Sequence, residues 1–164
     1  MLVRLLDVEK DGRVFKEAWE WSRSAPKWFL DTLDVWKETF EEQMDAAKNE
    51  LHYGVFVADQ ATAVVRLIEA FPWVFNIHLA ARRRTPLETL VEAGSKLRDF
   101  LYSQGVQGFY GYIPAQNRGI IRLYEALGFR DSGIRCFKGA THGRVIEWKH
   151  MVAGVGCSSN LSEC

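Results

Sequence analysis

One stretch of sequence decides the fold of this protein: Asn117-Arg118-Gly119-Ile120-Ile121-Arg122-Leu123-Tyr124-Glu125-Ala126-Leu127-Gly128-Phe129. Asn117 is a preferred helix N-cap, and apolar side chains then recur at positions 120, 123, 124 and 127 along one helical face. Gly128 ends the helix where a left-handed residue is favoured, and Phe129 begins an apolar run. The stretch therefore predicts a helix over 117–127 that passes directly into a strand.

The rest of the chain alternates between the periods of helices and strands. Alternating or continuous apolar runs predict strands over 2–8, 51–58, 62–70, 73–82, 106–113, 129–138 and 144–152. Helical spacing predicts helices over 13–24, 28–48 and 85–104, the second with a stripe of Phe29, Leu33, Trp36, Phe40 and Met44. Because a helix connects strands 73–82 and 106–113, we expect these two strands to be parallel neighbours.

Composition limits the class of protein. The chain has 164 residues, 48% of them hydrophobic, which suits one globular domain with its own core. Basic and acidic residues are each 21 in number, so a net charge of zero does not point to nucleic acid or an anionic membrane as a partner. No run approaches the about 18 apolar residues of a membrane span, and the N-terminus lacks a signal-peptide pattern.

Three cysteines, at 136, 157 and 164, form no metal-ligand spacing. They indicate reduced thiols, a cytoplasmic or intracellular protein and no metal site. We expect a single domain over residues 1–152 and a small, polar C-terminal tail over 153–164, which is a candidate contact for a protein partner.

The predicted order, β-α-α-β-β-β-α-β-α-β-β, together with the Asn117–Phe129 motif, resembles the GCN5-related N-acetyltransferase (GNAT) superfamily. The resemblance covers residues 1 to about 152. It implies an α/β (α+β) GNAT fold with a mixed central sheet and helices on both faces. It also implies acetyl-CoA as cofactor and a small-molecule or protein amine as acceptor.

The same resemblance implies roles for particular residues. Acetyl-CoA would enter where strands 73–82 and 106–113 separate, and the strand that carries His78, Leu79 and Ala80 would offer its main chain to the pantetheine arm. Asn117 would bind this arm from the far side, and Tyr124 would protonate the departing thiolate. From the residues alone, a packed Tyr124 and an Asn117 that only caps its helix remain open alternatives.

The general base has two candidates. His78 shares a strand face with Asn76 and Ala80, near the predicted separation of the strands. Glu69, near the end of the preceding strand, is the other candidate. Either side chain would relay a proton from the substrate ammonium through water. A half-buried, hydrogen-bonded histidine without catalytic role is the alternative for His78.

The sequence departs from the family at its phosphate loop. The family pattern is Gln/Arg-x-x-Gly-x-Gly/Ala, whereas residues 82–89 read Arg-Arg-Arg-Thr-Pro-Leu-Glu-Thr, without glycine. Thr85, Pro86 and Glu88 predict a capping box with proline at the first helical position, which would use donors that a pyrophosphate needs. Arg83 and Arg84, with Arg82, are candidates to hold the phosphates by their side chains, or they form a solvated strand end.

Six tryptophans are many for this length. In the family, the first two helices form the wall for the acceptor substrate, which makes Trp28 and Trp36 candidates to line a substrate or partner groove. Trp36 belongs to the apolar stripe of its helix, which favours a position in the core. For Trp21 and Trp28, both the core and the acceptor wall remain open.

Two functions follow from these observations. The first is transfer of an acetyl group from acetyl-CoA to a primary amine. The second is a catalytically inactive GNAT-fold structural or assembly protein, such as a bacteriophage virion or head-assembly component, with protein partners. It is favoured by the glycine-free loop and the self-capped helix start, which predict weakened acetyl-CoA binding, and by the C-terminal tail as a candidate partner contact.

Overall fold

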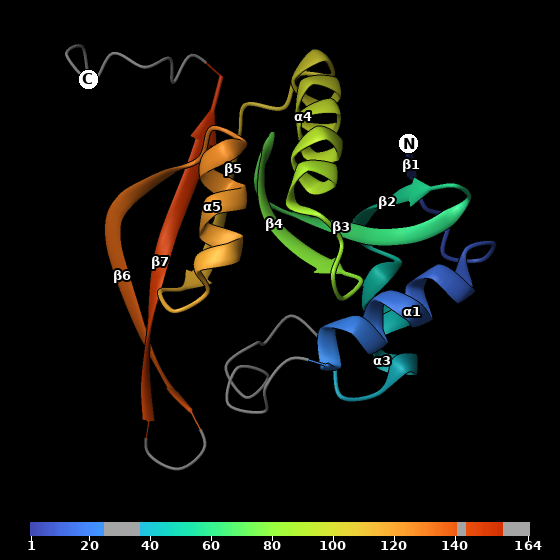
Figure 1. Ribbon diagram of the computed structural model, residues 1–164, viewed down its shortest axis with the longest axis horizontal. Coiled ribbons are helices and arrows are strands. Elements are labelled where there is room, and N and C mark those ends of the chain that lie inside the picture. Colours follow the sequence, from blue (N-terminus) through green and yellow to red (C-terminus); the bar gives the residue numbers. More distant parts are fainter. Residues whose placement is uncertain (25–36, 141–143, 156–164) are drawn as a thin grey trace.

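The computed structural model describes residues 1–24, 37–140 and 144–155, and their elements follow the predicted order (Figure 1). The helices are α1 (Gly12–Arg23), α3 (Phe40–Ala47), α4 (Leu87–Ser103) and α5 (Arg118–Ala126). The strands are β1 (Leu2–Leu5), β2 (Leu51–Val57), β3 (Gln60–Phe71), β4 (Val74–Ala81), β5 (Gly108–Pro114), β6 (Arg130–Ala140) and β7 (Arg144–Gly154). The predicted first strand, 2–8, is shorter than expected and ends at Leu5.

The strands form one sheet in the order β1-β2-β3-β4-β5-β7-β6. The pair β4–β5 is parallel, as predicted from its helical crossover, and the other pairs are antiparallel. The parallel ladder is short: it joins Val74 to Gly108 and Asn76 to Tyr110, and it extends no further. Beyond Asn76 the two strands therefore separate.

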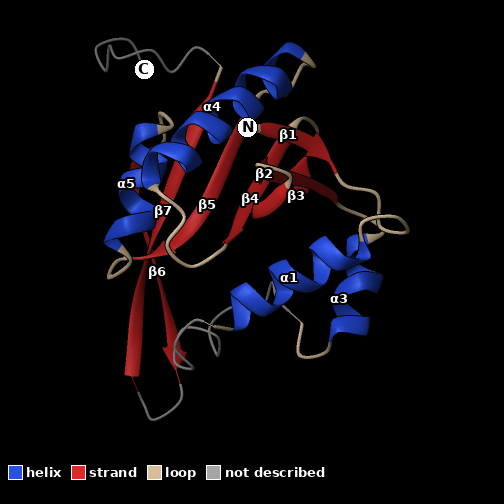
Figure 2. Cartoon of the chain, turned by 45° about the vertical axis from the view of Figure 1, so that its right-hand side comes forward, coloured by secondary structure: helices blue, strands red, loops and turns tan. Residues whose placement is uncertain are grey.

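Helices cover both faces of the sheet (Figure 2). On one face, α4 and α5 pack through Leu97 and Leu123 against strand residues such as Leu67 and Phe109. On the other face, α1 and α3 pack against a second core that includes Ala80 of β4. Burial of each large apolar side chain contributes about 1.5–3 kcal/mol, so the two cores fix the helices on the sheet.

The predicted end of α5 is confirmed in detail. Gly128 has a φ of 85° and its N–H donates to the carbonyl of Glu125, while the N–H of Phe129 donates to the carbonyl of Tyr124. These two bonds and the left-handed glycine form a Schellman motif. The rings of Phe129 and Tyr124 lie 4.6 Å apart, which is the apolar contact that accompanies this motif. The end of the helix thus fixes the position of Tyr124.

The prediction of one continuous helix over 28–48 is wrong at its centre. Residues 37–39 are not helical, and α3 begins at Phe40. The physical reason is a capping box, in which Thr39 accepts from the N–H of Glu42 and the Glu42 carboxylate accepts from the N–H of Thr39. The predicted positions Phe29, Leu33 and Trp36 lie outside the described residues.

We predict that Gly128→Ala lowers the free energy of unfolding by about 1–2 kcal/mol, because an L-residue is strained at positive φ. Chemical denaturation of the variant measures this loss. Gly12→Ala is the matched control: no atom lies within 4 Å of the added Cβ, and no positive φ is required there. Equal stability of the two variants would contradict the role assigned to Gly128.

Candidate functional site

A cavity of about 230 Å³ lies where β4 and β5 separate. Because side chains on a strand alternate between faces, successive residues of β4 line it from both sides of the sheet. Residues of α5 and of α1 also line the cavity. The lining residues are Trp21, Ser22, Ile77, His78, Leu79, Ala80, Ala81, Tyr112, Ile113, Pro114, Asn117, Ile120, Tyr124 and Trp148.

Tyr124 forms the wall of this cavity between α5 and the sheet. Its side chain is buried, and its hydroxyl donates a hydrogen bond of 3.1 Å to the carbonyl of Ile77, just beyond the last β4–β5 pair. Gly111 of β5 leaves room for the ring, because a Cβ at this position would lie 3.0 Å from Tyr124 Cε1. Burial raises the pKa of the Tyr124 phenol, so the hydroxyl keeps its proton at neutral pH.

Asn117 caps α5, as its residue type predicts. Its Oδ1 atom accepts from the N–H of Ile120 at 3.3 Å. The side-chain amide keeps two N–H donors that this cap does not use. Asn117 therefore combines a structural role with a position in the wall of the cavity.

His78 lines the cavity from the α1 face of β4, the face it shares with Ala80. Its Nε2 atom is buried and has no hydrogen-bond partner among the described residues. Burial, with smaller contributions from the charges of Arg66 and Lys138, lowers the pKa of His78 to about 4. At neutral pH the ring is therefore uncharged.

A row of buried polar side chains extends from His78 across the sheet. His78 is the cross-strand partner of Arg66, and Arg66 is the partner of His52. Glu50 forms a two-pronged ion pair with Arg66, and its Oε2 atom lies 3.7 Å from His52 Nε2. Burial is also the main cause that lowers the pKa of His52 to about 4, so both histidines are held neutral beside a paired arginine.

Leu79 and Ala80 line the cavity with Asn117, Tyr124 and His78, so the structure brings these predicted site residues together. Glu69 lies elsewhere: its Oε1 atom accepts from the N–H of Trp73 at 3.1 Å and closes the turn between β3 and β4.

Arg83 and Arg84 are exposed in the turn that leads from β4 to α4, and they do not line the cavity. The turn places them between the end of one cavity strand and the start of α4.

The predicted capping box of Thr85 and Glu88 is wrong. Pro86 is the N-cap of α4, and no side chain caps this helix. The Thr85 hydroxyl instead donates to the carbonyl of Arg82 at 2.8 Å, and the Thr85 N–H donates to the same carbonyl. Because the turn holds Thr85 away from the helix, the first N–H groups of α4 are not occupied by a side-chain cap.

Sequence reasoning missed part of the cavity wall. Tyr112 and Trp148 line it from β5 and β7, and Trp21, left open above, lines it from α1. Alternation along β5 was the available signal for Tyr112, and a charged Arg66 within an apolar strand was the signal for the buried row. Trp28 and Trp36 lie outside the described residues.

The described residues show neither a metal-ligand cluster nor a helix suited to a membrane. In residues 1–24, 37–140 and 144–155, no three side chains of histidine, cysteine, aspartate or glutamate gather as metal ligands would. None of the helices in these ranges combines the length and apolarity needed to cross a membrane.

Comparison with solved structures identifies the fold. A mutant of the spermidine N-acetyltransferase SpeG from Vibrio cholerae matches with a TM-score of 0.74 at 16% identity, over 93% of this chain and 92% of that chain. A GNAT-family acetyltransferase from Streptococcus pneumoniae matches with a TM-score of 0.73 at 13% identity, over 93% and 98%. The putative acetyltransferase yncA from Salmonella typhimurium, solved with acetyl-CoA, matches with a TM-score of 0.71 at 16% identity, over 100% and 99%.

No protein-family profile matches the sequence, and no curated protein is detectably similar to it in sequence. The three-dimensional likeness nevertheless confirms the predicted fold class. The chain has the GNAT fold, with a mixed sheet between helices on both faces.

We predict that the free energy of unfolding falls as pH falls from about 6.5 to about 4. In this window the unfolded chain protonates His52 and His78 while the folded chain does not, at a cost of up to about 1.4 kcal/mol per histidine for each pH unit. Urea unfolding at pH 7, 6, 5 and 4.5 measures the slope, and His78→Gln should reduce it. A flat profile would contradict the neutral burial of these rings.

Proposed function

We propose that the protein is an acetyl-CoA-dependent N-acetyltransferase that acts on a primary amine. The observation that carries the proposal is the cavity between the separated strands β4 and β5, whose wall combines Leu79, Ala80, Asn117 and Tyr124. The similar yncA structure contains acetyl-CoA, which supports this cofactor for the fold. Acetyl-CoA would supply an activated thioester at the cavity, and the residues of the chain would bind it and move protons.

In the proposed reaction, an uncharged amine nitrogen attacks the thioester carbonyl, and the carbon–sulfur bond breaks. His78 would take the proton of the amine, directly or through water, because it lines the cavity and its ring is neutral. Tyr124, whose hydroxyl keeps its proton, would donate that proton to the departing thiolate and receive one in turn before the next cycle. We favour His78 over Glu69 because the Glu69 carboxylate is engaged in the β3–β4 turn.

The phosphates of acetyl-CoA would lie at the start of α4. Its first N–H groups carry no side-chain cap, and a helix N-terminus attracts anions. Arg83 and Arg84, exposed in the preceding turn, would add side-chain contacts that the glycine-free backbone does not provide. These contacts would also offset repulsion from the exposed Glu88 in the first turn.

The alternative is a non-catalytic structural or assembly protein, such as a phage virion component. Its support was the glycine-free loop, the predicted capping box and the C-terminal tail. The box is not formed, and residues 156–164 of the tail lie outside the described residues. The glycine-free sequence of residues 82–89 remains its support. Acetyl-CoA binding separates the two functions.

We predict that acetyl-CoA raises the melting temperature, since a ligand at about 100 times its Kd adds about 2.7 kcal/mol of stability. Asn117→Ser keeps an N-cap but loses the amide donors, so its affinity for acetyl-CoA should fall about threefold to tenfold at nearly unchanged stability. Asn117→Ala should in addition lose about 1 kcal/mol of stability. No shift of the melting temperature at millimolar acetyl-CoA would overturn the proposal. If Asn117→Ser bound acetyl-CoA as tightly as the wild type, the role of Asn117 would be limited to capping α5.

We predict that Tyr124→Phe slows acetyl transfer by about 100-fold or more, because it removes the proposed proton donor. Its melting shift with acetyl-CoA should persist, and its free energy of unfolding should fall by about 1 kcal/mol because the Ile77 carbonyl loses its partner. Tyr53→Phe is the matched control, since Tyr53 is similarly buried and does not line the cavity. An unchanged rate in Tyr124→Phe would remove Tyr124 from the acid role.

A further inference from the structure

An apolar groove of about 480 Å³ lies on the sheet face opposite α5. Gly111 faces the ring of Tyr124 of α5, so its strand neighbours Tyr110 and Tyr112 point to the opposite face. Their cross-strand partners on β7 are Val152 and His150, which complete this side of the groove. Phe71 and Val74, at the turn between β3 and β4, line its far end. We call this the sheet groove.

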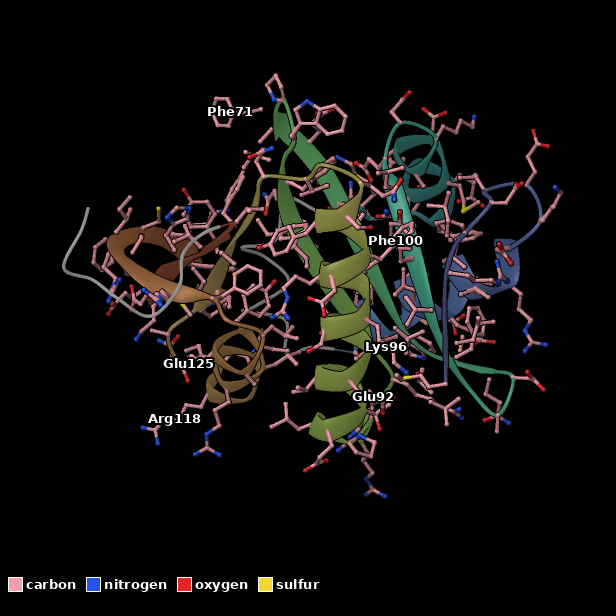
Figure 3. All side chains as sticks on the ribbon, turned by 90° about the horizontal axis from the view of Figure 1, so that it is seen from above. Phe71, Glu92, Lys96, Phe100, Arg118 and Glu125 are labelled. Atoms are coloured by element: carbon pink, nitrogen blue, oxygen red, sulfur yellow. The ribbon has the colours of Figure 1, made fainter. Side chains whose placement is uncertain are left out.

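The sheet groove is rich in exposed aromatic surface. The exposed fractions are 68% for Phe71 and 40% for Tyr112, and Trp73 beside them is 55% exposed. Phe71 lies across the molecule from Glu92 of α4 and Arg118 of α5 (Figure 3). The rings of Tyr112 and His150 are in contact, with centroids 4.8 Å apart and planes inclined by 33°, so these two side chains of the groove support each other. Exposed aromatic rings gathered around a hollow offer apolar surface to a ligand.

The groove adjoins the cavity of the proposed acetyl transfer. Tyr112 is a lining residue of both, with His78 and Tyr124 in the cavity and with Phe71 in the groove. A molecule whose amine reaches His78 from this side therefore has the rest of its body over Tyr112.

We infer that the acceptor is an amine joined to an extended apolar body, which lies in the sheet groove while the amine enters the cavity past Tyr112. The inference rests on the proposed function and names the class of its acceptor.

Charge supports this class over a polyamine. The residues that line the groove carry no permanent charge, and burial lowers the pKa of His150, which favours its neutral form. A polyamine carries a cation every few bonds, and these cations would lose hydration in the groove without gaining partners there. An apolar body instead gains from leaving water against the aromatic floor.

Acetyl transfer to three amines tests the inference: n-butylamine, 4-phenylbutylamine and spermidine. We expect kcat/KM for 4-phenylbutylamine to exceed that for n-butylamine at least about tenfold, with spermidine no better than n-butylamine. Phe71→Ser should remove most of this advantage and leave n-butylamine and the acetyl-CoA melting shift unchanged. Phe137→Ser is the control, because Phe137 is 66% exposed and lies on β6 outside the groove.

Equal kcat/KM for the two monoamines, or an advantage that survives Phe71→Ser, would overturn the inference while acetyl transfer itself stands. Absence of acetyl transfer together with no acetyl-CoA melting shift would instead overturn the proposed function. Analytical ultracentrifugation of the wild type and of Phe71→Ser tests the alternative that a second copy of the chain occupies the groove. A wild-type dimer that Phe71→Ser converts to monomer would show that a second copy fills the groove, and would overturn the inference.

Discussion

The short parallel pairing of β4 and β5 is the constraint on which the rest of the structure depends. The ladder ends at Asn76 and Tyr110, and beyond this pair β4 and β5 are not paired with each other. An open pair of strands would leave polar backbone groups unpaired, at a cost of about 1–3 kcal/mol for each buried group. The Tyr124 hydroxyl relieves one of them by donating to the Ile77 carbonyl. Residues of α1 and α5 line the cavity together with the separated strands.

The same few residues link stability to the proposed chemistry. The Schellman motif at Gly128 positions Phe129 against Tyr124, and the Asn117 cap fixes the start of the same helix. On the other side of the sheet, Glu50 neutralises a buried Arg66 next to His78. Removal of Glu50 would leave the charge of Arg66 buried and unpaired. The Glu50–Arg66 pair is therefore part of the environment in which His78 stays neutral.

Local patterns predicted most of the fold, and they failed where tertiary contacts select between equivalent local signals. Thr85-x-x-Glu88 and Thr39-x-x-Glu42 are equally good capping boxes by sequence, yet only the second forms. The Thr85 side chain is instead bound to the Arg82 carbonyl, in a turn set by the end of β4. Likewise, Glu69 has the chemistry of a base, but a hairpin turn of its own strand uses its carboxylate.

By itself, the sequence determined the order of helices and strands, the parallel β4–β5 pair and the roles of Asn117 and Gly128 at the ends of α5. These follow from periodicity and backbone preference, which act over a few residues. Only the tertiary structure decided that Trp21, Tyr112 and Trp148 share a wall with His78, and that a groove adjoins the cavity at Tyr112. These residues come from four different elements, and only the packing of α1 on a twisted, partly separated sheet brings them together.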